Sequence, residues 1–106
     1  MSELSGRLRE RIAIERLDIA RDELGGSGND WAADGEVWAA LTPDGRAGDQ
    51  RGQAADAMPR WRVTMRPRAI GLDHRLIRGD RRMRVRAVLA DPRTPDRIVI
   101  EAEEER

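Results

Sequence analysis

Apolar and polar side chains alternate with a period of two through most of the second half of the chain. Such alternation is typical of strands that bury one face, and it covers residues 60–66, 76–89 and 97–104. The middle segment predicts a hairpin, because Gly79-Asp80 interrupts it and glycine supplies the positive φ that a tight turn needs. A proline-containing loop at residues 91–96 separates this hairpin from the last strand.

The first half of the chain alternates less regularly. Residues 3–24 are rich in helix formers, yet Ile12 and Ile14 alternate with less apolar neighbours, so the local pattern leaves helix and strand open. Residues 31–41 predict a strand that is interrupted or bent near Gly35. We expect three of its apolar side chains on one face and a tryptophan on the other: Val37, Ala39 and Leu41, with Trp38 opposite.

These elements predict an all-β fold. Four to six short strands, many turns and no sustained helix in the second half are typical of a small antiparallel β-barrel or sandwich. With 106 residues, we expect one domain over residues 1–106. One long loop, at about residues 42–59, is inserted between strands and almost lacks large apolar side chains. A loop this long in a domain this small usually has a function or is disordered.

Composition excludes several kinds of chemistry. The chain has no cysteine, which removes disulfides, thiolate nucleophiles and cysteine-based zinc sites, and its one histidine cannot build a histidine-rich metal centre. Asp73-His74 looks like a carboxylate–imidazole pair, but adjacent residues of a strand point to opposite faces. We therefore expect no catalytic residue, no metal and no cofactor. The longest apolar run, residues 37–41, is far shorter than the ~20 residues of a membrane helix, so we expect no membrane association.

Three tryptophans are the chain's only aromatic side chains other than histidine. Tryptophan can stack on nucleic acid bases. In a chain without Phe or Tyr, we interpret the three as the large fillers of the core.

The 20 basic residues, all arginine, balance 20 acidic residues, but the two signs are segregated along the chain. Residues 60–86 carry ten arginines and two acidic residues, a net charge of +8, whereas the segments before and after are acidic. A basic block of this density can bind phosphates, although such a block is also typical of a sheet face that is solvated or paired with neighbouring charges.

The pairing of the last two predicted strands determines which of these arginines have acidic partners. If residues 91–96 close a hairpin, one register forms three apolar pairs on the inner face and three Arg–Glu pairs on the outer face. These pairs are Leu89–Ile98, Ala87–Ile100, Val85–Ala102, Arg86–Glu101, Arg84–Glu103 and Arg82–Glu105. We therefore expect truncation after Ala102 to unmask DNA binding. The arginines left free for partners or DNA would be Arg60, Arg62, Arg66, Arg68, Arg75 and Arg78.

Several segments, in order, resemble one protein family across about 95 residues. They are LRERIAIER at 8–16, the pair Trp31 and Trp38, WAALTP at 38–43, RVTMR at 62–66 and RGDRRMRVRAV at 78–88. The chain resembles the head–tail joining (head closure, or stopper) proteins of siphophage-type particles, a family shared by gene transfer agents. This resemblance implies a β-barrel, and it favours strand over helix for residues 8–17.

The resemblance also implies a structural role rather than an enzymatic one. It implies a homo-oligomeric ring of six or twelve copies in the neck of a virion or virus-like particle, assembled in the bacterial cytoplasm. That ring lies between the portal or adaptor ring and the tail terminator ring, closes or gates the channel for double-stranded DNA, and docks the tail. The expected interface or gating residues lie in and beside the long loop: Pro43, Asp44, Arg46, Asp49, Gln50, Arg51, Gln53 and Met58.

An alternative hypothesis is a small nucleic-acid-binding β-module that uses the arginine-rich strands. Its affinity for DNA should fall steeply as salt rises, whereas a conduit ring must let DNA slide.

Overall fold

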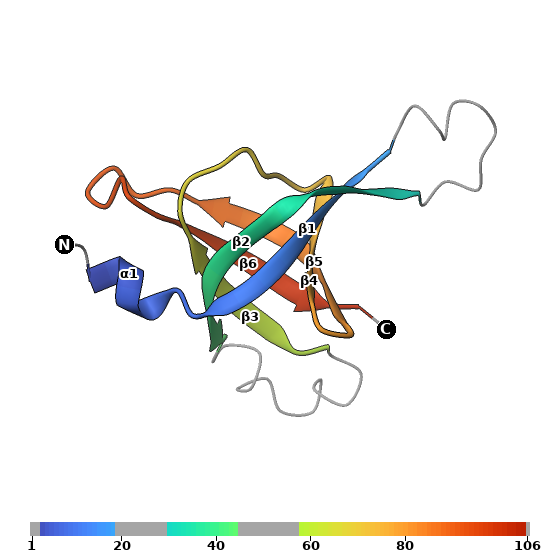
Figure 1. Ribbon diagram of the computed structural model, residues 1–106, viewed down its shortest axis with the longest axis horizontal. Helices are drawn as coiled ribbons and strands as arrows, with labels where there is room; N and C mark the ends of the chain where they lie inside the picture. Colours follow the sequence, from blue (N-terminus) through green and yellow to red (C-terminus); the bar gives the residue numbers. More distant parts are fainter. Residues whose placement is uncertain (1–2, 19–29, 45–57, 106) are drawn as a thin grey trace.

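The alternating segments form strands, and these strands close into one barrel (Figure 1). The computed structural model describes residues 3–18, 30–44 and 58–105. In these ranges a short helix precedes six antiparallel strands, whose order around the barrel is β1-β2-β3-β6-β5-β4. The elements are α1 (Glu3–Arg7), β1 (Glu10–Leu17), β2 (Trp31–Pro43), β3 (Arg60–Met65), β4 (His74–Arg78), β5 (Arg81–Leu89) and β6 (Ile98–Glu104). The predicted all-β barrel is confirmed.

Strand β1 resolves the ambiguity of the first segment. It pairs with β2 on one side and with β4 on the other, and these two ladders complete the barrel. Ile12 and Ile14 are fully buried inside it. Strand pairing and burial outweigh the helix propensity of this segment, so helix within the described ranges is confined to α1. No helix in the described ranges is long and apolar enough to span a membrane.

The inner faces of the six strands form the core. Its fully buried large side chains come from five strands: Ile12, Ile14, Val63, Met65, Leu76, Met83, Val85 and Ile100. The interpretation of the tryptophans as core fillers is wrong for Trp38, which is 52% exposed. Trp61 is partly buried and packs against the core, and Trp31 lies under the Arg75 guanidinium at 4.5 Å. Branched aliphatic side chains and methionine fill this narrow barrel instead.

Two glycines have the left-handed backbone that their positions require. Gly79 has φ of +62° at the first position of the β4–β5 turn, as predicted for this hairpin. Gly35 has φ of +113° in the middle of β2, where the register between β1 and β2 also shifts. The predicted bend of this strand is therefore confirmed, and Ala39 points inward while Trp38 points outward.

The predicted register of the last two strands is right at one end and wrong at the other. Arg84 pairs with Glu103 and Val85 with Ala102, as expected. A bulge after Val85 then inserts one extra residue, so the pairs continue as Ala87–Glu101, Val88–Ile100 and Leu89–Val99. The expected pairs Arg86–Glu101, Ala87–Ile100 and Leu89–Ile98 do not form. Because of this shift, Leu89 lies opposite Val99 and is exposed rather than part of the core.

The long loop begins later than predicted, because β2 continues through Thr42 and Pro43, which pair with β3. Asp44 and Met58 are the described residues at its two ends. The other expected interface residues, namely Arg46, Asp49, Gln50, Arg51 and Gln53, lie outside the described ranges.

Candidate functional site

The outer face of β3, β6 and β5 carries a row of carboxylates between two rows of arginines. Glu103, at the centre, pairs with Arg86 of β5 at 2.5 Å and with Arg60 of β3 at 3.4 Å. Glu105 lies 3.9 Å from Arg84. We call Glu103, in β6, and Glu105, just after it, the β6 carboxylates. They neutralise arginines on both neighbouring strands, although the bulge gives Arg86 a different partner from the one predicted.

Most of the arginines expected to be free are paired within the chain. Arg75 pairs with Glu15 at 2.7 Å, and Arg78 pairs with Glu10 at 2.8 Å. Arg60 and Arg68 are also ion-paired, while Arg66 donates to the Ser5 hydroxyl at 3.0 Å. Only Arg62 of this set forms no ion pair or side-chain hydrogen bond within the described ranges. The expectation of six unpaired arginines is therefore wrong, and contact of these residues with DNA or partners stays a prediction.

These six arginines also do not form one patch. Arg60 and Arg62 lie on β3, whereas Arg75 and Arg78 lie on β4, and two strands separate β3 from β4 in either direction around the barrel. Opposite sides of the barrel therefore carry them.

His74 lies in a polar cluster that the sequence interpretation missed. It is 6% exposed, with Nδ1 at 2.7 Å from Asp73 and Nε2 at 3.1 Å from Asp34. The expectation that these two side chains point to opposite faces is wrong, because Asp73 precedes β4 in a turn and strand alternation does not apply to it. Arg68 also donates to Asp34, so the cluster joins the bend of β2 to the start of β4. Within the described ranges, no group of three or more potential ligands could hold a metal ion.

The arginines around Glu103 change its acidity. Its hydrogen bonds from Arg86 lower the pKa of the Glu103 carboxyl below its ordinary value of 4.5, although burial opposes this shift. A carboxyl with a lowered pKa stabilises the fold above its unfolded-state pKa, and this stabilisation is lost as pH falls through the lowered value.

We expect Glu103→Gln to make the free energy of unfolding less dependent on pH below about 4.5. The substitution should reduce stability at neutral pH and have a smaller effect in acid, where the native carboxyl is protonated as well. Urea unfolding of both proteins across this range measures the difference. Equal destabilisation at neutral and acidic pH would show that the Arg86 contact does not stabilise the ionised carboxylate.

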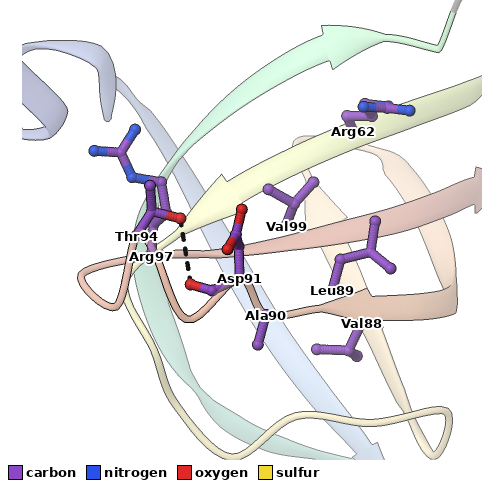
Figure 2. Close-up of a pocket in the computed structure, with 8 residues that line it drawn as sticks. All are labelled: Arg62, Val88, Leu89, Ala90, Asp91, Thr94, Arg97 and Val99. Atoms are coloured by element: carbon purple, nitrogen blue, oxygen red, sulfur yellow. Dashed lines mark hydrogen bonds between the residues drawn. The ribbon is translucent and has the colours of Figure 1, made fainter.

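Beside this charged row, the outer face has an apolar depression with a volume of about 530 Å³ (Figure 2). Its floor is formed by Val88, Leu89, Ala90 and Val99, and its rim includes Arg62 and Arg97. Figure 2 shows that these side chains come from β3, β5, β6 and the loop between β5 and β6, where Thr94 bonds the Asp91 carbonyl. Leu89 is 44% exposed and Val88 is 36% exposed. An exposed apolar cluster with a polar rim is typical of a protein-binding surface.

The depression continues into a basic cleft on the neighbouring strands. Arg62, Arg97 and Val99 line both hollows, and the cleft adds Arg7 and the hydroxyl-bearing Thr42 and Thr64. Thr64 is 8% exposed and makes no side-chain hydrogen bond within the described ranges. One side of this surface is therefore apolar and the other suits an anionic group.

The ends of the long loop lie near the carboxylate row. Met58 lines a shallow hollow with Arg84, Arg86 and Glu103–Glu105. Asp44 donates its backbone N–H to the Arg60 carbonyl, and Pro43 ends β2 beside Trp61. Three of the expected interface residues thus surround the start of β3, while the apolar depression was not predicted. The apolar run Val88-Leu89-Ala90, which breaks the alternation, is the signal that could have located it.

Comparison with known proteins gives a consistent result. The family model described as phage head completion protein matches residues 4–105. No curated protein matches the chain. The solution structure of protein SF1141 from Shigella flexneri 2a is similar, with 23% identity over 93% of this chain and 94% of that chain and a TM-score of 0.64. A chain from the virion of a native gene transfer agent particle has 24% identity over 93% and 96%, with a TM-score of 0.61. At these identities the two structures establish a shared fold.

Proposed function

Because this chain belongs to the phage head completion protein family, we propose that it forms a homo-oligomeric ring in the neck of the particle. The family is structural, and its members are components of a phage or phage-like virion that act in head closure. Our proposal adds a ring of six or twelve copies between the portal or adaptor ring and the tail terminator ring. This ring closes or gates the channel for double-stranded DNA and docks the tail, after assembly in the cytoplasm.

The observation that carries the proposal is the exposed apolar depression on β5 and β6. Its half-exposed Val88 and Leu89 are poorly placed for a solitary protein but well placed for a subunit that packs against another. The internally paired arginines support the same role, because a surface that binds DNA weakly lets DNA slide through the ring. The chain's lack of a cysteine nucleophile agrees with a role without catalysis.

We test the location with a single labelled thiol. The chain has no cysteine, so Leu72→Cys, at a residue that is 62% exposed and does not line the apolar depression, introduces one site for maleimide-gold. The labelled protein is added to DNA-filled heads made without this protein and imaged by electron microscopy. We expect gold at one vertex, several copies per particle, and recovery of DNA retention and tail attachment. Label scattered over the capsid, or heads that retain DNA and attach tails without the protein, would refute the neck role.

A further inference from the structure

Two exposed apolar features lie on opposite sides of the barrel. Trp38, on β2, is 52% exposed, and the depression with Leu89 lies on β5 and β6. In the closed order β1-β2-β3-β6-β5-β4, two strands separate β2 from β5 in either direction. The outer faces of β2 and β5 therefore point away from each other.

The charges beside these two features are complementary. Glu36 lies two residues before Trp38, so both side chains are on the outer face of β2, and Glu36 is 56% exposed. Its partner Arg11 lies over the Trp38 ring at 5.1 Å and is itself half-exposed. An exposed pair of this kind contributes little stability, so Glu36 can change partners when another cation approaches.

The rim of the depression offers such a cation. Arg62 forms no ion pair within the described ranges, although Glu101 stands at its cross-strand partner position. One side of the molecule thus presents an indole beside a carboxylate, and the opposite side presents an apolar hollow beside an unpaired guanidinium.

We propose that Trp38 of one copy inserts into the depression of the next copy, with Glu36 facing Arg62. This inference rests on the proposed ring and identifies the contact that builds it. A contact between two different faces leaves one face of each kind free at every step, so copies add head to tail, and they close into a ring where the rotation between successive copies allows it. A two-fold contact of Trp38 with Trp38 would instead bring two Glu36 carboxylates together. Tryptophan in a fitted hollow is also a side chain that commonly dominates the binding energy of an interface.

The test replaces Trp38 with the photoreactive aromatic residue benzoylphenylalanine, which preserves a large ring on this exposed surface. Isotope-labelled and unlabelled full-length protein are mixed, concentrated or assembled on heads, irradiated, and mapped by mass spectrometry. We expect cross-links between copies from position 38 to residues 88–99. Cross-links to the region around position 38, to other parts of the barrel, or to no second copy would overturn the contact.

Two controls separate this contact from the ring itself. The same photoreactive residue at Leu72, which is 62% exposed, should give no cross-link to residues 88–99. Leu89→Asp should reduce the cross-link yield from position 38 by about tenfold or more, whereas Leu72→Asp should leave it unchanged. Copies that form a closed ring on the head, as seen by electron microscopy, without the cross-link to residues 88–99 would refute this contact and leave the ring intact. Absence of any ring would refute the proposed function as well.

Discussion

Replacing Leu76 with alanine should lower the free energy of unfolding by about 3–5 kcal/mol. Leu76 is fully buried on β4 and belongs to the cluster that fills the barrel. Its truncation removes apolar contacts and leaves a cavity, because backbone ladders on both sides hold β4 in place. This loss is a large fraction of the stability of a small domain. Urea unfolding followed by circular dichroism measures it.

Leu72→Ala provides the matched control. Leu72 precedes β4 by two residues and is 62% exposed, so its truncation should change the free energy of unfolding by less than about 0.5 kcal/mol. Similar effects of the two substitutions would show that Leu76 is not enclosed by the core as described.

Strand positions were predictable where burial follows the local alternation. Val63 and Met65 point inward and Arg62 outward, as the alternation of β3 indicates, and Gly79 forms its predicted turn. Strand β1 was not decided by local pattern, because its residues also favour helix. Its conformation depends on pairing with β2 and β4, and β4 lies about 60 residues further along the chain.

The predicted register between β5 and β6 is correct as far as Val85 and wrong beyond it. Alternation assumes that each residue of one strand faces one residue of the next, and the bulge after Val85 breaks that correspondence. Arg84 keeps its predicted partner position, but Leu89 turns from the expected core to the surface. The error therefore concealed the apolar depression, which is the main part of the candidate site.

The ion-pair partners of the arginines are a second feature that the sequence alone could not predict. The predicted register gives acidic partners only to Arg82, Arg84 and Arg86, so it leaves Arg75 and Arg78 unpaired. The closed barrel places β4 beside β1, where Glu15 and Glu10 lie 60 and 68 residues away in sequence. Segregation of charge along the chain thus becomes neutralisation in space, which no count over a segment can predict.

Because carboxylates neutralise these arginines, removal of the carboxylate charges should have a large effect on DNA binding. We expect the unsubstituted protein to bind DNA weakly, whereas the variant with Glu103→Gln and Glu105→Gln should retard duplex DNA at low salt. Glu103 pairs with Arg60 and Arg86, and Glu105 lies within 3.9 Å of Arg84. The substitutions release these guanidinium groups while keeping the shape of both side chains. Truncation after Ala102 is a less specific test than these substitutions, because it also removes residues that pair β6 with β3 and β5.

We expect the double variant to bind with the roughly 10⁻⁴–10⁻⁶ M dissociation constants typical of non-specific sites, at least about tenfold tighter than the unsubstituted protein. The logarithm of its affinity should fall linearly with that of salt concentration. Glu36→Gln with Asp91→Asn changes the net charge equally but frees arginines elsewhere, Arg11 and Arg93, and should bind less tightly. Equal binding by both variants would mean that net charge alone controls DNA affinity. Equal binding by the first variant and the unsubstituted protein would show that the β6 carboxylates do not mask a DNA-binding surface.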